Sequence, residues 1–270
     1  MPQASTEIPL PLPAGLLARL AAGHKLILFL DYDGTISEIT PDIRNAQPVA
    51  GVRDLIGKLA VCAERFRVVV ISGRQLKELM RMLGVRGGVT FVGNHGLELM
   101  EPGGGIRPAV DPALFTPALD AIRRWLCANV PEAAGFVVED KGFSVALHYR
   151  LADPGPALSI RMRLAEFVRE HLPTLKVTEG KMVIEALPHQ ANKGQAVRAL
   201  MRDEGRERLA VYFGDDATDE DAFFVLRDAG VTVKVSAQPR PSWARYRVAS
   251  PHDVVAALSE MASTPRNAAL

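Results

Sequence analysis

The sequence predicts an α/β fold in which helices cover both faces of a mostly parallel sheet. Short apolar runs alternate along the chain with segments that have the spacing of amphipathic helices, which is typical of this class. The run at 26–30 has five apolar residues in succession, a length that suits a strand rather than a helix. Because it has no polar side, we expect a parallel strand buried on both faces. Further strands are expected at 67–71 and 209–213.

The remaining core elements follow from apolar spacing and from proline and glycine positions. Residues 1–13 carry four prolines and little pattern, so we expect a disordered or extended tail. Pro48 is well placed to start an amphipathic helix. The expected elements are helices at 14–22, 49–65, 75–83, 192–204 and 251–261, a hairpin of 89–92 with 97–100, and strands at 231–235 and 247–249.

A glycine-rich break at 102–105 marks a domain boundary. From there to residue 187 the pattern is helix, strand, strand, helix, strand, strand, which predicts an α+β unit with its own antiparallel sheet. We therefore expect residues 14–104 and 188–270 to form a core, with residues 105–187 as an inserted domain. The expected elements of the insert are helices at 114–130 and 158–171 and strands at 135–139, 143–149, 176–179 and 181–186.

Composition excludes several classes of partner. The 270 residues carry a formal net charge of +1, which gives no electrostatic reason to expect nucleic acid or an anionic membrane. No apolar run approaches the roughly 20 residues that span a bilayer, and no basic segment precedes an apolar stretch at the N-terminus. We expect a cytoplasmic monomer. Cys62 and Cys127 lie far apart on helix-like stretches, and we expect them to be free and buried.

Two acidic residues directly follow the first strand. Asp31 and Asp33 would stand at its carboxyl end, where open α/β sheets bind ligands. A divalent cation would offset the repulsion between the two carboxylates, and a carboxylate can also attack phosphorus to give an aspartyl-phosphate. The structural alternative is an Asp-Gly turn after a buried strand.

Polar groups also follow other core elements. Ser72 follows the strand at 67–71 and could donate to a phosphoryl oxygen or cap the next helix. Lys193 opens a helix, where it could serve a site or be a solvated first-turn lysine. Asp215 and Asp216 follow the strand at 209–213. Enrichment of acids at a helix start explains residues 218–220, but it does not explain this pair.

Together, these carboxylates, one hydroxyl and one ammonium predict phosphoryl transfer with Mg²⁺. Asp31 is the expected nucleophile. Asp33 is placed to protonate the leaving oxygen and later to deprotonate water, and its backbone carbonyl is an expected metal ligand. Asp215 is the third expected metal ligand. Asp216 is expected to act through water, and Asp219 to cap a helix or support the ligands from behind.

These motifs resemble those of the haloacid dehalogenase superfamily of phosphotransferases. Residues 31–35 are similar to its first motif, and Ser72, Lys193 and residues 214–219 are similar to its second, third and fourth. The resemblance implies a Rossmann-like core. It also implies that the insert between Ser72 and Lys193 is an α+β cap domain of the C2 type.

Within this superfamily the chain resembles the trehalose-6-phosphate phosphatase family. The family implies hydrolysis of trehalose 6-phosphate to trehalose and phosphate with Mg²⁺, as a step of trehalose biosynthesis. The segments that carry the resemblance are 30–39, 71–74, 93–99, 138–150, 179–188, 192–194 and 214–223.

The resemblance also implies substrate contacts, namely that Glu139, Lys141, Lys181 and Glu185 on the cap face the sugar. Glu139 and Lys141 are two apart on an expected strand, and so share one face. Cross-strand ion pairing on a solvated sheet face is the alternative. Weaker candidates for the substrate shell are Arg74, Asn94 and His95, the last of which could equally be satisfied in a turn.

Two other functions stay open at this point. The first is a phosphatase of another sugar phosphate, such as sucrose phosphate, mannosyl-phosphoglycerate or phosphomannose, with the same kind of cap. The second is a non-enzymatic protein that uses a degenerate core for binding. The complete set of acids speaks against the second, because a binding module needs no nucleophile paired with an acid.

Overall fold

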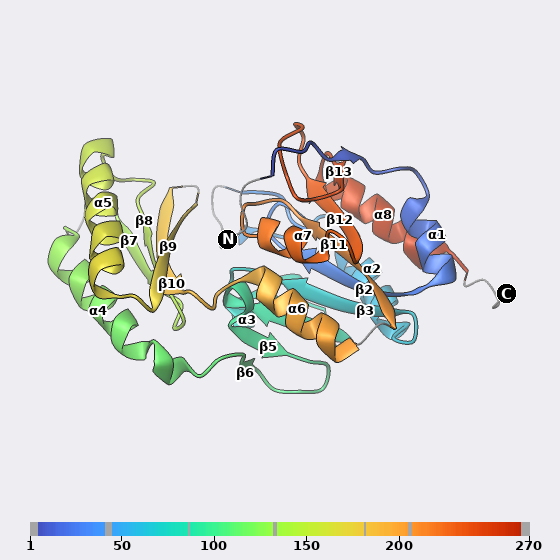
Figure 1. Cartoon of the computed structure of the whole chain (residues 1–270), viewed down its shortest axis with the longest axis horizontal. Helices are drawn as coiled ribbons and strands as arrows, with labels where there is room; N and C mark the ends of the chain where they lie inside the picture. Colours follow the sequence, from blue (N-terminus) through green and yellow to red (C-terminus); the bar gives the residue numbers. More distant parts are fainter. Residues whose placement is uncertain are drawn as a thin grey trace. The chain divides into compact units, whose positions relative to one another are not determined.

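The computed structural model describes residues 5–40, 45–85, 87–131, 134–180, 182–204 and 207–265. The chain divides into two compact units, each of which has its own sheet (Figure 1). We call Met1–Arg107 with Asn192–Leu270 the core unit, and Pro108–Ala191 the insert unit.

The core unit contains a nine-stranded sheet. In the spatial order given below, the strands from β1 at the edge as far as β4 run parallel to one another, and β5 pairs with β4 antiparallel. The mostly parallel sheet predicted from the sequence is therefore confirmed. In spatial order the strands are β1 (Leu10–Pro11), β13 (Tyr246–Val248), β12 (Gly230–Val235), β11 (Arg208–Gly214), β2 (Lys25–Asp31), β3 (Phe66–Ile71), β4 (Val89–Gly93), β5 (Glu98–Met100) and β6 (Arg107–Pro108).

The strand order reverses between β2 and β11. From β2 the chain continues to β3 and β4 on one side, and from β11 it continues to β12 and β13 on the other. The register pairs Leu30 with Phe213, so Asp31 and Gly214 come next on adjacent strands. Ligands of open α/β sheets bind in the crevice at such a switch point. The topology therefore brings the first acidic segment beside the second.

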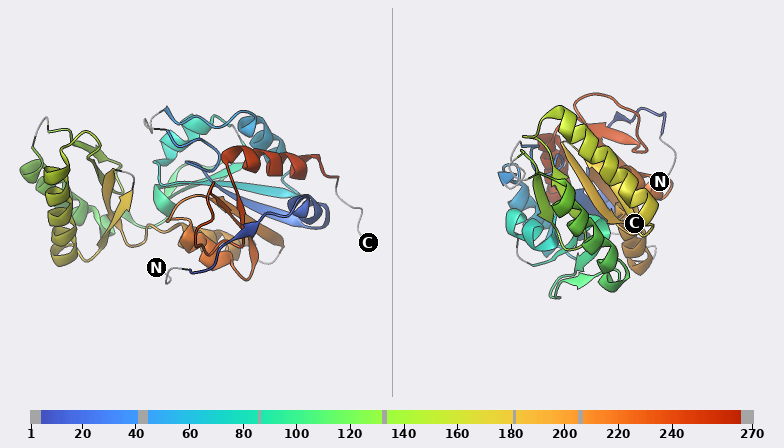
Figure 2. Two further views of the ribbon diagram at one scale, coloured as in Figure 1. Left: turned by 90° about the horizontal axis from the view of Figure 1, so that it is seen from above. Right: turned by 90° about the vertical axis from the view of Figure 1, so that its left-hand side faces the viewer.

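Each face of the core sheet is covered by helices. Alternate residues of β2 pack on opposite faces: Leu28 belongs to one apolar cluster, and Phe29 to another. This arrangement explains the uninterrupted apolar run. Red α8 (Pro251–Ser263) and orange α7 (Glu220–Leu226) lie on opposite sides of the sheet (Figure 2). Helices α1 (Leu16–Gly23), α2 (Val52–Val61), α3 (Leu76–Leu83) and α8 (Pro251–Ser263) contribute to the first cluster, and α6 (Lys193–Glu204) and α7 (Glu220–Leu226) to the second.

The insert unit is a four-stranded antiparallel sheet with two helices packed on one face. Its order of helix, strand, strand, helix, strand, strand is the one that the sequence predicts. Leu147 and Ile184 point to the helices and form part of a separate apolar core. The elements are α4 (Thr116–Asn129), β7 (Val137–Asp140), β8 (Val145–His148), α5 (Pro154–His171), β9 (Leu175–Gly180) and β10 (Val183–Pro188), with a short 3₁₀ turn at Pro112–Leu114. A second 3₁₀ turn, at Asn94–Gly96, belongs to the core unit.

Of the two alternatives for the tail over residues 1–13, disorder or an extended chain, the structure shows an extended chain at Leu10–Pro11. Leu10 and Leu12 donate their N–H groups to Arg245 and Arg247 of the β13 segment, at 3.1 and 3.0 Å. Pro11, which has no N–H, falls between these two donors, and a proline is tolerated in an edge strand in this way. The segment therefore extends the sheet as β1.

Two further expectations concern exposure. Cys62 and Cys127 are free, as expected, but both are exposed rather than buried. Cys62 follows the last residue of α2, and the buried residues of α4 do not include Cys127. Among the residues that the structure describes, no helix combines the length and the apolar character needed to cross a bilayer.

Candidate active site

The carboxylate of Asp31 is held from both sides at the carboxyl end of β2. Lys193 Nζ donates to Asp31 Oδ1 over 2.7 Å, and Thr35 Oγ1 donates to Asp31 Oδ2 over 3.2 Å. Asp31 is only 3% exposed. Its side chain is therefore fixed by an ammonium and a hydroxyl in a nearly closed environment.

Lys193 is buried and bridges two carboxylates, so it is not a solvated first-turn lysine. Its Nζ lies 2.7 Å from Asp31 Oδ1 and 2.8 Å from Asp219 Oδ1. Burial disfavours the ammonium, but Asp219 and Asp31 outweigh this effect and raise the pKa of Lys193 well above its ordinary value. The cap at the start of α6 comes instead from Asn192, which accepts from the N–H of Gln195. Lys193 is thus free to point inward as a permanent cation.

Asp219 organises the acidic loop. Its Oδ1 accepts hydrogen bonds from Lys193 and from the Tyr212 hydroxyl, and its Oδ2 accepts from the N–H groups of Asp215 and Asp216. Asp219 stands at the N-cap position of α7, but its side chain makes no capping bond there. Of the two roles expected for Asp219, capping of the helix is excluded, and its carboxylate fixes the backbone that presents Asp215.

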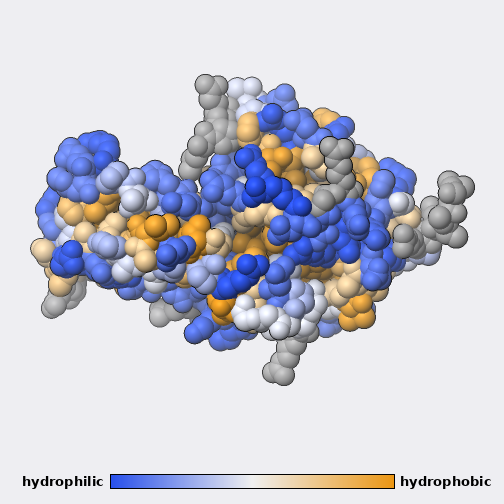
Figure 3. Space-filling view, turned by 60° about the horizontal axis from the view of Figure 1, so that its bottom comes forward, coloured by the Kyte–Doolittle hydropathy of each residue, from blue (hydrophilic) through white to orange (hydrophobic). Residues whose placement is uncertain are grey.

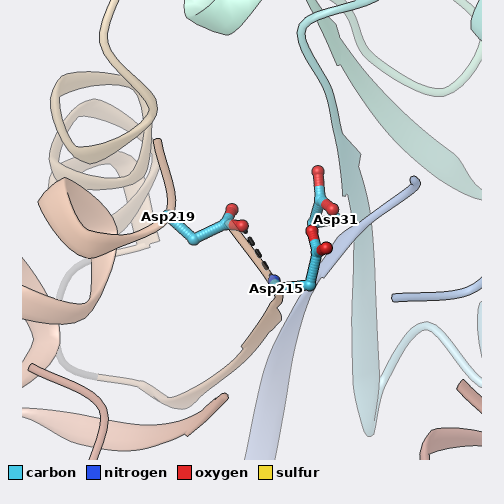
Figure 4. A group of neighbouring side chains, drawn as sticks. All are labelled: Asp31, Asp215 and Asp219. Carbon is cyan, nitrogen blue, oxygen red and sulfur yellow. Dashed lines mark hydrogen bonds between the residues drawn. The ribbon is translucent and has the colours of Figure 1, made fainter. Parts of the chain in front are cut away.

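Three carboxylates gather closely enough to hold a cation. Oxygens of Asp31, Asp215 and Asp219 all lie within 4.8 Å of one another (Figure 4). Asp219 already accepts from four donors, so Asp31 and Asp215 are the carboxylates best able to bind a cation. A few carboxylate oxygens completed by water are the surroundings that Mg²⁺ prefers. The residues present therefore fit a magnesium ion.

The carboxylates of Asp216 and Asp33 take part in other contacts. Asp216 Oδ1 accepts from Thr218, both at the N–H and at the hydroxyl, over 2.8 and 2.7 Å. Asp33 is held by Arg74. Among the described residues, neither carboxylate belongs to the group of three that lies close together. Metal binding by the Asp33 backbone carbonyl, and by Asp216 through water, stays a prediction.

The acidic cluster has too little positive charge for all its carboxylates to ionise easily. Burial raises the pKa of Asp31 well above its ordinary value, although Lys193 opposes this. Burial, followed by repulsion from Asp216 and Asp219, raises the pKa of Asp215 to about 8. Burial would also raise the pKa of Asp216, but Lys193 and hydrogen bonds lower it below its ordinary value. A divalent cation between Asp31 and Asp215 would favour the ionised form of both.

Arg74 forms a bidentate ion pair with Asp33. Its Nε and Nη2 donate to the two oxygens of Asp33, each over 2.7 Å, and its Nη1 donates to Glu78 over 3.1 Å. Such forked pairs fix the carboxylate in direction as well as in place. The side chain of Asp33 is 40% exposed while that of Arg74 is 9% exposed. Arg74, expected to contact substrate, thus positions Asp33 in this structure.

Ser72 lies beside this pair and does not cap a helix. It follows β3, is buried, and its Oγ accepts from the N–H of Arg74 over 3.2 Å. The N-cap position of α3 is occupied by Gln75. The capping alternative for Ser72 is therefore excluded.

Asn94 and His95 form a strained turn next to Ser72. Their φ angles of 47° and 56° lie in the left-handed region, which is uncommon for non-glycine residues. The His95 N–H donates to the Ser72 carbonyl over 3.0 Å, and a Cβ on Gly73 would lie 2.4 Å from the His95 ring. Asn94 donates to Glu98 over 2.7 Å. Strain of this kind concentrates at functional sites.

The open face of the insert sheet carries a second group of polar side chains. The register places Glu139 and Glu185 on either side of Ala146, so both glutamates share one row and one face. Lys141 Nζ lies 3.2 Å from Glu185 Oε1, and His148 Nε2 lies 2.8 Å from Glu139 Oε2. Cross-strand ion pairing is thus present among the predicted sugar contacts. Lys181 lies outside the described residues.

Several residues of these two groups were not predicted. Thr35, Tyr212, Ser144 and His148 each bind one of the acids described above. For Ser144 and His148 a signal was available, because they alternate along the strand at 143–149 and so share its polar face. Tyr212 lies within a buried apolar strand, and nothing in the sequence indicates that its hydroxyl donates a hydrogen bond to an acid of the site.

The chain has the fold of a haloacid dehalogenase-like hydrolase. A structure titled as a haloacid dehalogenase-like hydrolase, from Bacteroides thetaiotaomicron, shares this fold with a TM-score of 0.61 at 17% identity, covering 88% of this chain and 98% of that one. The sequence profile described as trehalose-phosphatase matches residues 29–252. The chain belongs to the trehalose-phosphatase family.

Relatives from plants and a solved structure agree with this assignment. The chain is 31% identical to the Arabidopsis thaliana protein named "Probable trehalose-phosphate phosphatase C", over 88% of this chain and 77% of that protein. The plant relatives are longer, and the chain spans 66% to 77% of their length. A crystal structure of a "trehalose-6-phosphate phosphatase related protein" matches with a TM-score of 0.71 at 28% identity, over 87% of this chain and 96% of that one.

Proposed function

We propose that this chain hydrolyses trehalose 6-phosphate to trehalose and phosphate through an aspartyl-phosphate on Asp31. The observation that carries the proposal is the fixed carboxylate of Asp31, held by Lys193 and Thr35 beside Asp215 at the switch point of the sheet. Membership of the trehalose-phosphatase family supports the choice of sugar. Asp31 and Asp215 would hold Mg²⁺, which supplies positive charge to the phosphoryl group when bound.

In the first step, a carboxylate oxygen of Asp31 attacks phosphorus. The bond between phosphorus and the sugar oxygen breaks, and the carboxyl group of Asp33 gives its proton to that oxygen. Lys193 neutralises charge at the phosphoryl group, and the hydroxyl of Ser72 donates to one of its oxygens. Free trehalose leaves, and phosphorus stays bound to Asp31.

In the second step, Asp33 accepts a proton from a water molecule, whose oxygen attacks phosphorus. The bond to Asp31 breaks, inorganic phosphate leaves, and both carboxyl groups return to their starting states. The forked pair with Arg74, with two bonds of 2.7 Å, favours the ionised form of Asp33, which is the form that accepts this proton.

Recognition of the sugar falls to polar side chains of the kind found on the open face of the insert sheet. Glu139, Lys141, Lys181 and Glu185 are the proposed contacts, together with Asn94 and His95 in the core unit. Carboxylates and ammonium groups pair well with sugar hydroxyls, since they accept and donate strong hydrogen bonds. We propose that the insert unit is a cap domain that determines substrate specificity.

A substrate comparison tests the proposal. Phosphate release is measured from trehalose 6-phosphate, sucrose 6-phosphate and glucose 6-phosphate, with Mg²⁺ and again with excess EDTA. We expect kcat/KM for trehalose 6-phosphate to exceed the others by about tenfold or more, which corresponds to about 1.4 kcal/mol, and EDTA to stop all three reactions. A preference for sucrose 6-phosphate would assign the chain to another sugar phosphate, and release from none of them would contradict the proposal.

A further inference from the structure

A cavity of about 680 Å³ opens at the amino ends of the core strands, away from the acidic loop. It is bordered by α6, α7 and the first residues of β11, all of which belong to the core unit. The residues that matter here are Arg198, Met201, Arg202, Leu209, Val225 and Ala229.

The wall of this cavity joins apolar surface to uncompensated positive charge. Met201, Leu209 and Val225 supply apolar atoms. Arg198 and Arg202 are four apart on α6, so they project from the same side of the helix, and both are exposed. Within the described part of the chain, neither forms an ion pair or a hydrogen bond.

Arg208 and Glu207, the other charged residues of the wall, already contact groups of the protein. Arg208 pairs with Glu204 over 3.0 Å and donates to the Ala63 carbonyl over 2.8 Å. Glu207, the acid of the wall, lies 3.7 Å from Lys25. Placing arginines in the last half of α6 stabilises the helix dipole. That effect explains their charge, but it does not explain an apolar hollow beside them.

We propose that this cavity binds a small organic phosphate. Arg198 and Arg202 together carry two positive charges, which match a phosphate dianion, and guanidinium groups bind phosphate oxygens in pairs. The apolar wall formed by Met201, Leu209 and Val225 contacts the ring or hydrocarbon part of the ligand. This combination of apolar lining and a few charged groups is usual in small-molecule sites.

The proposed site is separate from the acidic cluster. β11 runs for seven residues from Arg208, in the cavity wall, to Gly214, which precedes Asp215. At about 3.3 Å per residue this separates the two ends by about 20 Å. A ligand in the cavity therefore does not touch Asp31 or Lys193, and binding at the two places can be told apart by mutation.

Calorimetric titration with adenosine 5′-monophosphate tests the proposal, using the full chain in EDTA. We expect one molecule to bind per chain. The double variant Arg198→Ala/Arg202→Ala should weaken binding by about tenfold or more, because it removes charged hydrogen bonds. Ala229→Trp should weaken it similarly by filling the cavity without changing charge. Circular dichroism verifies that both variants are folded.

Matched controls separate this site from general charge and from the active site. Arg81→Ala/Arg124→Ala removes two exposed arginines elsewhere, and Asp31→Asn alters the acidic cluster; both should bind as the unchanged chain does. Adenosine without phosphate should not bind. The proposal would be overturned if no saturable binding were seen, if all variants bound equally, or if Asp31→Asn lost binding. It would also be overturned if adenosine, which lacks the phosphate, or benzoate, an anion without phosphate, bound with the same affinity as adenosine 5′-monophosphate.

Discussion

Asp31 combines burial with two fixed hydrogen-bond donors, and this combination leads to a sharp prediction for its amide variant. Asp31→Asn should lower phosphate release by roughly 10⁴-fold or more, because an amide cannot form the covalent intermediate. The measurement is phosphate release at saturating substrate, and thermal unfolding provides the control for folding. Lys193 retains Asp219 as a partner in this variant. A near-normal rate would remove Asp31 as the nucleophile.

Asp215 makes the metal site dependent on pH. Burial and the neighbouring Asp216 and Asp219 raise the pKa of Asp215 to about 8, from 3.8 for a free side chain. Without metal, the folded protein therefore holds a proton between these values that the unfolded chain releases. The contribution of Asp215 to the free energy of unfolding falls as pH rises through this window.

The binding of Mg²⁺ should release the proton that Asp215 holds. Between about pH 6 and pH 8 the ion must displace the proton of Asp215, so affinity for Mg²⁺ should rise with pH and level off above about pH 8. Calorimetry at pH 7 in buffers of different ionisation enthalpy should detect at least one proton released per ion, and fewer at pH 9. A pH-independent affinity would contradict this, and Asp215→Asn should weaken the dependence.

Residues that directly follow strands were predictable, and residues that act by tertiary contact were not. Asp31 and Asp215 stand out because a buried apolar run stops at each of them, and the strand order then brings them together. For Asp219 the sequence left two roles open, a helix cap or support of the ligands. Its four donors could not be identified in advance, because they come from three separate places in the chain. The pairing of Arg74 with Asp33 likewise depends on how β2 and β3 are placed side by side.

At the level of elements, the turn after β2 depends on a glycine. Gly34 has a φ of 78°, and a Cβ built there would lie 2.2 Å from Asp215 Oδ2. Gly34→Ala should lower the free energy of unfolding by about 1–2 kcal/mol for the left-handed backbone. It should also weaken Mg²⁺ binding by about 10- to 100-fold, because it displaces the carboxylate that we propose as a metal ligand. Thermal unfolding and metal titration measure the two effects.

Gly57 provides the matched control for this substitution. It lies inside α2, and no atom stands within 4 Å of a Cβ built there. Gly57→Ala should therefore raise the free energy of unfolding by about 0.5–1 kcal/mol and leave Mg²⁺ affinity unchanged. If both variants bind Mg²⁺ like the unchanged chain, then Gly34 does not make room for Asp215.

Strands could be predicted where burial imposes an apolar pattern. A strand that forms only by pairing with a segment distant in the sequence could not. β2, β3 and β11 are buried on both faces over most of their length, so each contains an apolar run that is easily recognised. β1 has no such pattern, since it exists only through backbone bonds to β13. Prolines in the tail left disorder and an extended chain both open, and the edge of the sheet accommodates them.

At the scale of the molecule, the two units have separate apolar cores. The insert core is formed by α4, α5 and the inward residues of its sheet, and the core unit has one cluster on each side of its sheet. The sequence marked the boundary at 102–105 by its glycines, while the contacts divide the chain at Arg107 and Pro108. The hydropathy of the surface over one face is shown in Figure 3. The residues proposed for phosphoryl transfer and those proposed to contact the sugar thus reside in units with independent cores.

This division predicts that specificity and chemistry can be separated by a single change. Glu185 is 8% exposed on the open face of the insert sheet and accepts from Ser144 and Lys141. Glu185→Ala should lower kcat/KM for trehalose 6-phosphate by about 10- to 100-fold, the value of one or two charged hydrogen bonds. Turnover of p-nitrophenyl phosphate, which has no sugar, should be nearly unchanged.

The control for this comparison is Glu179→Ala in the adjacent strand. Glu179 pairs with Ile184 in the register and so belongs to the opposite face, where it contacts Arg161. Removing it should affect neither substrate, because both variants lose one carboxylate from the same sheet but only Glu185 lies on the open face. Equal losses on the two substrates for Glu185→Ala would mean that the glutamate supports the fold of the insert rather than the recognition of the sugar.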